Sequence, residues 1–205
     1  MALTRFPLTN PNSLSSKYRP GEKLYATLEL NQVAFPKTGM VVSQTPLSED
    51  FTIDAPCENG MWVVGDKAAG VIAAPAAATD KPIGIVYTAE KEYDDYHYGL
   101  ARFGRKIAGD YPRVGLLGIG DTVTTNCLQY DESDFATEAD LIDALNKIDT
   151  APLYVVPGVA ATTNVAKAVP QIVKAAPASG IYAKIVKFYT VPNGEAGVKY
   201  QIISL

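Results

Sequence analysis

The sequence Ile181-Tyr-Ala-Lys-Ile-Val-Lys-Phe-Tyr-Thr-Val191 decides the fold, together with Gly197-Val-Lys-Tyr-Gln-Ile-Ile-Ser204. Both runs are rich in β-branched and aromatic residues and are separated by Pro-Asn-Gly-Glu-Ala, so they predict a β-hairpin. In the second run the residues alternate, with Val198, Tyr200 and Ile202 on one face and Lys199, Gln201 and Ile203 on the other. Since successive side chains of a strand point to opposite faces, one face should be buried and the other mostly in water.

Further strands are expected on the N-terminal side of this hairpin. Short apolar or alternating runs bounded by turn residues predict strands at 23–32, 38–44, 51–53, 61–65, 70–73, 82–88, 113–119 and 122–130. The last two runs are separated by Gly120-Asp121, and this pair between β-branched runs predicts a second hairpin. The residues from 90 to 112 are expected to form a long loop.

After residue 131 the apolar residues recur at the spacing of a helix. Thr137 and Asp140 resemble a capping box, and they precede four apolar residues at helical spacing: Leu141, Ile142, Leu145 and Ile148. Residues 153–156 are expected to form a short strand. A second amphipathic helix is predicted from the spacing of Val165, Val169, Ile172 and Val173, in which Pro170 must lie near the first turn or kink the axis.

These patterns together predict an α+β, β-dominated fold, with a central antiparallel sheet or small barrel, two short helices and an extended N-terminal arm. The arm comprises residues 1–22, and residues 23–205 form a single β-rich body. Within the body, 23–130 contribute mainly strands, 131–178 a helix-strand-helix unit and 179–205 the C-terminal hairpin.

The charge of the chain is unevenly distributed. The chain has 205 residues, a formal net charge of -4 and a pI near 5.0, which disfavours binding of nucleic acid by the whole surface. Residues 1–23 hold four basic residues and one acidic residue, a net +3, so the rest of the chain is at -7. We therefore expect a cationic arm on an acidic body.

No targeting or membrane segment is expected. The start of the chain lacks the apolar core of a signal peptide, and no stretch approaches the roughly 18 apolar residues of a membrane span. Two cysteines, Cys57 and Cys127, are too few for a disulfide scaffold, so we expect reduced thiols and synthesis in the cytoplasm.

The sequence offers little catalytic chemistry. His97 is the single histidine. The spacing of Cys57, His97 and Cys127 matches no zinc signature, and the glycines of 115–120 are in the wrong order for a phosphate loop. No catalytic residue, cofactor or metal is therefore predicted.

Two segments hold the candidate partner-contact residues. In the arm, apolar and basic residues on a polar, turn-rich segment suit docking on a partner, with packing on the chain's own body as the alternative. In the segment 90–98, tyrosines beside carboxylates suit recognition of a sugar or a cation, with a solvated loop whose tyrosines lie over the body or a neighbouring subunit as the alternative. The candidates are Arg5, Phe6, Leu8, Lys17, Tyr18, Arg19, Tyr93, Tyr96 and Tyr98.

Three segments resemble the small auxiliary proteins, called decoration or cement proteins, that bind the outside of tailed-bacteriophage capsids. These segments are Pro82-Ile-Gly-Ile-Val-Tyr-Thr88, the run from Tyr111 to Asn126 with Gly-Leu-Leu-Gly-Ile-Gly-Asp-Thr-Val-Thr-Thr, and the run from Tyr182 to Gly194 with its return strand. The resemblance implies a non-enzymatic virion protein, made in the host cytoplasm, whose partners are the major capsid protein and copies of itself. It implies no role for any single residue.

Three hypotheses follow for the function. The first is a capsid decoration protein. The second is another virion component, such as a tail-tube or head–tail connector protein. The third is a carbohydrate-binding module built around Tyr93, Tyr96 and Tyr98.

Overall fold

The fold is taken from a computed structural model of the chain. The structure describes residues 3–6, 41–42, 44–66, 70–81, 83–87, 105–159, 167–190 and 196–205.

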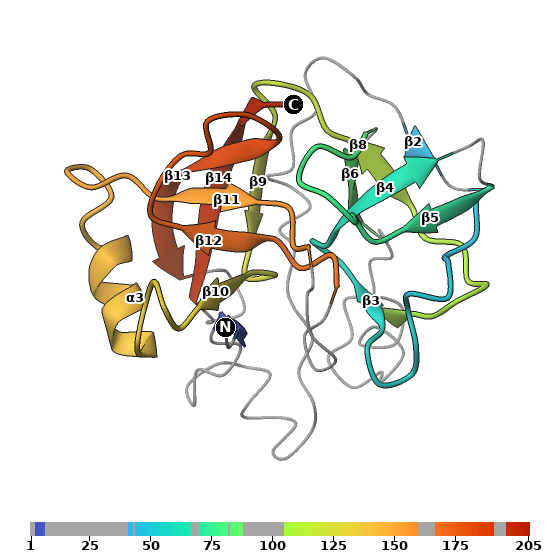
Figure 1. The fold of residues 1–205 in the computed structure, drawn as a ribbon, viewed down its shortest axis with the longest axis horizontal. Helices are drawn as coiled ribbons and strands as arrows, with labels where there is room; N and C mark the ends of the chain where they lie inside the picture. The colour runs from blue at the N-terminus through green and yellow to red at the C-terminus, as the bar shows by residue number, and fades with distance from the viewer. Residues whose placement is uncertain are drawn as a thin grey trace.

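The described residues form two larger sheets, a two-stranded ribbon and one short helix (Figure 1). The seven-stranded sheet has the order β1-β10-β12-β11-β13-β14-β9, and the five-stranded sheet has the order β2-β8-β6-β4-β5. The ribbon pairs β3 with β7. The elements are β1 Leu3–Arg5, β2 Val41–Val42, β3 Cys57–Glu58, β4 Trp62–Asp66, β5 Val71–Ala73, β6 Ile83–Val86, β7 Arg105–Lys106, β8 Val114–Leu116, β9 Thr122–Thr125, β10 Gln129–Asp131, α3 Glu138–Leu145, β11 Tyr154–Val156, β12 Gln171–Val173, β13 Tyr182–Thr190 and β14 Ala196–Ser204. The prediction of a β-dominated fold is confirmed.

The predicted C-terminal hairpin is confirmed, and it lies inside the seven-stranded sheet. β13 pairs with β14, β11 flanks the hairpin on one side and β9 flanks it on the other. Val198, Tyr200 and Ile202 are all fully buried, as their alternation predicted. The hairpin therefore supplies two interior strands of the sheet and part of the core.

The five-stranded sheet is buried on both faces. Trp62, Ile83 and Ile85 project into the core shared with the seven-stranded sheet, whereas Val63 and Val86 project into a second core on the other side. This alternation explains why all four residues of β6 are buried.

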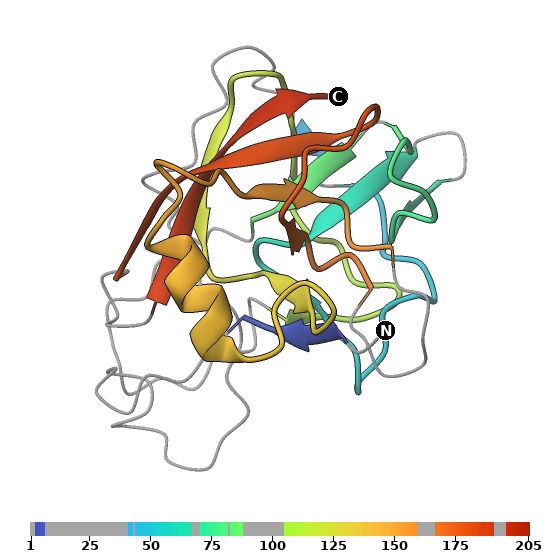
Figure 2. The ribbon, with the colours of Figure 1, turned by 60° about the vertical axis from the view of Figure 1, so that its left-hand side comes forward.

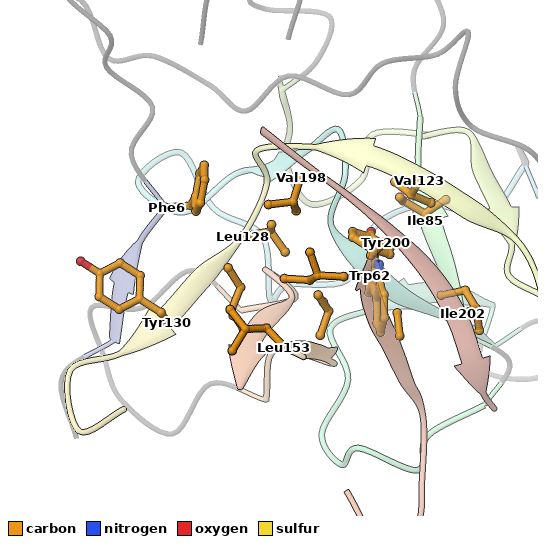
Figure 3. Close-up of a cluster of buried hydrophobic side chains, with 14 of the residues drawn as sticks. Phe6, Trp62, Ile85, Val123, Leu128, Tyr130, Leu153, Val198, Tyr200 and Ile202 are labelled. Atoms are coloured by element: carbon orange, nitrogen blue, oxygen red, sulfur yellow. Dashed lines mark hydrogen bonds between the residues drawn. The ribbon is translucent and has the colours of Figure 1, made fainter. Parts of the chain in front are cut away.

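The two sheets meet at a buried pair of aromatic residues. The indole N–H of Trp62 on β4 donates a hydrogen bond of 2.9 Å to the hydroxyl of Tyr200 on β14. Their rings meet edge to face at 5.7 Å between centroids, and both side chains are fully buried. Figure 3 shows this pair beside Ile85, Val123 and Ile202, with Phe6 and Tyr130 at the other end of the core. Burial raises the pKa of Tyr200, so its hydroxyl stays protonated.

The first predicted helix is confirmed as α3. The Thr137 hydroxyl accepts a hydrogen bond from the Asp140 N–H, and the Asp140 carboxylate accepts one from the Thr137 N–H, which forms the expected capping box. Leu141 and Leu145 are its buried residues and point into the main core.

The prediction of a second helix is wrong where the structure describes that segment, because Gln171–Val173 form strand β12 between β10 and β11. Ala168 adopts φ 68°, in the left-handed region, and Pro170 has no N–H for a helical bond. Ile172 is fully buried in the middle of the sheet. The described apolar residues that predicted a helix therefore lie in or just before a strand.

The prediction of a hairpin between 113–119 and 122–130 is also wrong. The turn exists, since the Asp121 N–H donates to the Gly118 carbonyl and the Asp121 carboxylate accepts from the Gly118 N–H at 2.7 Å. However, β8 pairs with β2 and β6 in one sheet, and β9 pairs with β14 in the other. This turn is where the chain crosses between the sheets.

Other strand predictions have mixed outcomes. Strands β4, β5, β6 and β11 match predicted runs, β2 lies inside 38–44, and 122–130 divides into β9 and part of β10. The predicted strand at 51–53 is wrong, because Phe51–Asp54 have no strand pairing. The predicted strand at 23–32 lies outside the described residues, as does most of the predicted loop.

The first described residues of the predicted arm belong to the body. β1 pairs antiparallel with β10 at the edge of the seven-stranded sheet. Among the described residues no helix has the length and apolar character needed to cross a membrane.

Replacing Tyr200 by phenylalanine should remove the acceptor for the Trp62 indole N–H, which is fully buried. Tyr200→Phe should lower the free energy of unfolding by about 1–3 kcal/mol, measured by urea denaturation. The control is Tyr111→Phe, because Tyr111 is 60% exposed and its change should stay within about 0.5 kcal/mol. Equal unfolding midpoints for both variants would contradict a structural role for the pair.

Gly158 should not tolerate a methyl group. A Cβ at this position would lie 1.8 Å from the Val169 carbonyl oxygen, so Gly158→Ala should lower the free energy of unfolding by at least about 1–3 kcal/mol. At Gly65 the nearest atom would be 3.8 Å away, and Gly65→Ala should be neutral or mildly stabilising in the same denaturation experiment. If Gly158→Ala unfolds at the same urea concentration as the wild type, then the backbone at Gly158 does not pack closely against the Val169 carbonyl.

Candidate interaction surface

Arg5 and Phe6, two of the predicted contact residues, pack against the chain's own body. The Arg5 guanidinium lies 3.3 Å from the Glu58 carboxylate. Phe6 is fully buried and meets Phe188 edge to face at 6.5 Å between ring centroids. The Thr4 hydroxyl donates to Glu132. This part of the arm therefore follows the alternative reading, a terminus that packs on its own body, and Phe6 is not available to a partner in this structure.

The other predicted contact residues lie outside the described residues. They are Leu8, Lys17, Tyr18, Arg19, Tyr93, Tyr96 and Tyr98. His97 lies outside the described residues as well.

The two cysteines are free thiols, both buried. Removal from water raises the pKa of Cys57 well above its ordinary value, and the nearby Cys127 and Glu58 add to this effect. Burial raises the pKa of Cys127 to about 12, against the opposing influence of the Arg5 guanidinium. These thiols therefore lack the thiolate character of a nucleophile or metal ligand. Within the described part of the chain, no three acidic, histidine or cysteine side chains cluster as a metal site would require.

The outer face of the C-terminal hairpin carries the most distinctive surface among the described residues. Ile185 and Phe188 both pack in the core, yet three positions separate them, because the register shifts between Ile185 and Lys187. This bulge turns two consecutive residues, Val186 and Lys187, outward, and both are exposed.

Neighbouring strands extend this surface. Tyr154 on β11 is the register partner of Lys184 and contacts Tyr182 edge to face at 6.0 Å between ring centroids. On β14, Lys199 is opposite Lys187. We call the outward set the lysine–tyrosine face: Tyr154, Tyr182, Lys184, Val186, Lys187, Tyr189, Lys199, Gln201 and Ile203.

The charge of the lysine–tyrosine face is of one sign. It holds three lysines, and strands β9, β11, β12, β13 and β14 contain no Asp or Glu. Lys187 and Lys199 are direct cross-strand partners, an arrangement that destabilises a sheet by a fraction of a kcal/mol to about 1 kcal/mol. The Lys187 ammonium lies 5.5 Å from the centroid of the Tyr189 ring, which offsets part of this repulsion. Among the ion pairs between described residues, none involves these three lysines.

This surface is suited to binding a macromolecule. It is the exposed face of a sheet, whereas sites for small molecules are concave and enclose most of the ligand. Lysine and tyrosine combine charge with large amphipathic contact area, and the exposed Val186 and Ile203 add apolar area. The arrangement therefore favours a partner that presents carboxylates.

The sequence contained a signal for this surface. The hairpin prediction already assigned Lys199, Gln201 and Ile203 to one face. The absence of any acid from both hairpin strands was also readable. The sequence did not predict the bulge at Val186, which brings Lys187 onto the same face. It also did not predict the pairing with β11, which adds Tyr154.

Comparisons of the chain with models of protein families, with curated proteins and with solved structures give no match.

Both thiols should be inert in the folded protein. With a pKa of about 12, roughly one Cys127 in ten thousand would be a thiolate at pH 8, so labelling by a thiol reagent should be far slower than in urea-unfolded protein. Because burial favours the neutral thiol, stability should be constant below the ordinary thiol pKa and should fall as the pH rises above about 9. Rapid labelling of either cysteine without denaturant would contradict this burial.

Proposed function

We propose that the protein is a non-enzymatic virion structural protein of a tailed bacteriophage that binds and stabilises the exterior of the capsid. Its partners would be the major capsid protein and copies of itself, and it would act on the capsid surface after synthesis in the host cytoplasm. The observation that carries this proposal is the lysine–tyrosine face, an exposed sheet surface of one charge sign on an acidic chain.

Such a surface suits an assembly protein. On a capsid every site recurs many times, so contacts that are individually weak become effective when several act together. Except for Tyr154, the face lies on the run from Tyr182 to Gly194 and its return strand, which is one of the segments that resemble decoration proteins.

The arm and the tyrosine-rich segment are the proposed contacts with the capsid itself. An extended segment with spaced apolar residues can order on a partner surface as it binds. Arg5 and Phe6 are used inside the chain, so this role falls to Leu8, Lys17, Tyr18 and Arg19, and to Tyr93, Tyr96 and Tyr98.

The test is the composition of particles of the phage that carries the gene. We expect the chain in purified virions at a copy number comparable to that of the major capsid protein, and on isolated capsids without tails. A Lys17→Ala, Tyr18→Ala, Arg19→Ala variant should be incorporated less, with its fold checked by circular dichroism, whereas Lys81→Ala in the described body should be incorporated normally.

Other results would overturn the proposal. Rings or tubes in micrographs, with the chain located in the tail or at the connector, would favour a tail-tube or connector protein. Absence from virions, with binding on a glycan array that is lost on substitution of Tyr93, Tyr96 and Tyr98, would favour a carbohydrate-binding module.

A further inference from the structure

A second surface of the same chain carries the opposite charge. Residues 131–150 contain seven acidic residues and one lysine, a net -6. Five of these acids are exposed on and around α3, and we call them the acidic cap: Glu132, Glu138, Asp140, Asp143 and Asp149.

The acidic cap has a shape that can receive side chains. The outer side of α3 borders a hollow lined by Glu138, Ala139, Ile142, Asp143 and Asn146. Its apolar part is formed by Ala139 and Ile142, and carboxylates lie beside it. Figure 2 shows α3 in front of the sheets, with no described element over its outer side. A tyrosine ring fits against the apolar part while an ammonium group meets a carboxylate.

We propose that the lysine–tyrosine face of one copy of this chain binds the acidic cap of another copy. The inference rests on the part of the proposed function that gives the chain copies of itself as partners, and it identifies the two surfaces that meet. The acidic cap presents the carboxylates that the three lysines favour. Each copy of the chain carries both surfaces, so a concentrated solution of the chain supplies both partners.

Charge complementarity favours this partner over a self-matched contact. Two lysine–tyrosine faces meeting each other would bring six lysines together, and two acidic caps would bring ten carboxylates together, so each like pairing repels. Because the two surfaces are unlike, the contact either closes as a reciprocal pair or continues from copy to copy as a ring or an open filament.

The repulsion between Lys187 and Lys199 is relieved in such a contact. In the free chain these cross-strand partners have the same charge. A carboxylate placed between them converts the repulsion into two attractions. Since the groups lie at the surface, the association must weaken with added salt.

A charge-swap experiment tests the proposal on the purified full chain. The face variant is Lys184→Glu, Lys187→Glu, Lys199→Glu, and the cap variant is Glu138→Lys, Asp143→Lys, Asp149→Lys. The cap variant leaves the capping residue Asp140 and the Thr4 partner Glu132 intact. Sedimentation velocity at about 0.05 M and about 0.5 M salt measures association.

The wild type should associate at low salt and dissociate at high salt. Each variant alone should associate at least about tenfold more weakly, because like charges then face each other. An equimolar mixture should regain association, because the reversed face of one variant complements the reversed cap of the other. A Lys184→Arg, Lys187→Arg, Lys199→Arg control keeps the charge and should behave as the wild type, and circular dichroism should show that all variants are folded.

Three results would overturn the proposal: a wild type that stays monomeric at low salt, variants that associate normally, or a mixture that does not regain association. The last of these would show that the lysine–tyrosine face does not meet the acidic cap. The outcome is independent of the virion test, because association is measured without capsids. A monomeric wild type found on capsids would remove this inference and leave the proposed function in place.

Discussion

The contact between the Trp62 indole and the Tyr200 hydroxyl is the constraint on which the rest of the structure depends. It is a hydrogen bond between two fully buried side chains, and it joins β4, next to the edge of the five-stranded sheet, to β14, next to the edge of the seven-stranded sheet. Its directionality fixes how the two sheets meet, which nondirectional apolar packing alone leaves open. With that relation fixed, the turn at Gly118–Asp121 can pass the chain between sheets, and the outer face of β13 and β14 is left to solvent.

Local patterns in the sequence were sufficient to predict the elements that form from neighbouring residues. The C-terminal hairpin depends on a turn and on alternation, and α3 depends on a capping box within residues 137–140, so both could be predicted. The wrong predictions concern partners that are distant in the chain. The spacing of Val169, Ile172 and Val173 indicated a helix, but so short an apolar run can also form a strand, and the pairing of Ile172 with β10 and β11 decided it. At Gly120-Asp121 the turn was correctly predicted, but the assignment of its two arms to different sheets is a property of the whole fold.

The candidate surface shows the same limit. The lysines of the hairpin and the acids of 131–150 could be counted in the sequence, but a count does not show that each set gathers on one surface. The lysines gather because the bulge at Val186 restores Lys187 to the outer face, and the acids gather because Leu141 and Leu145 anchor α3 with its polar side outward. Arg5 and Phe6 were predicted as contacts from their residue types alone, yet Arg5 at the end of β1 pairs with Glu58, and Phe6, the next residue, is buried in the main core.

The position of β13 and β14 also sets the time at which the molecule can fold. These strands lie between β11 and β9, so the edge of β9 stays open until residues 182–204 have left the ribosome. β1 must likewise wait more than a hundred residues for β10. Assembly of the seven-stranded sheet is therefore a late event dominated by distant pairings, a topology associated with slow folding and with open strand edges while it is incomplete. A chain interrupted before residue 182 would expose those edges, and the cell would meet it as an aggregation-prone intermediate.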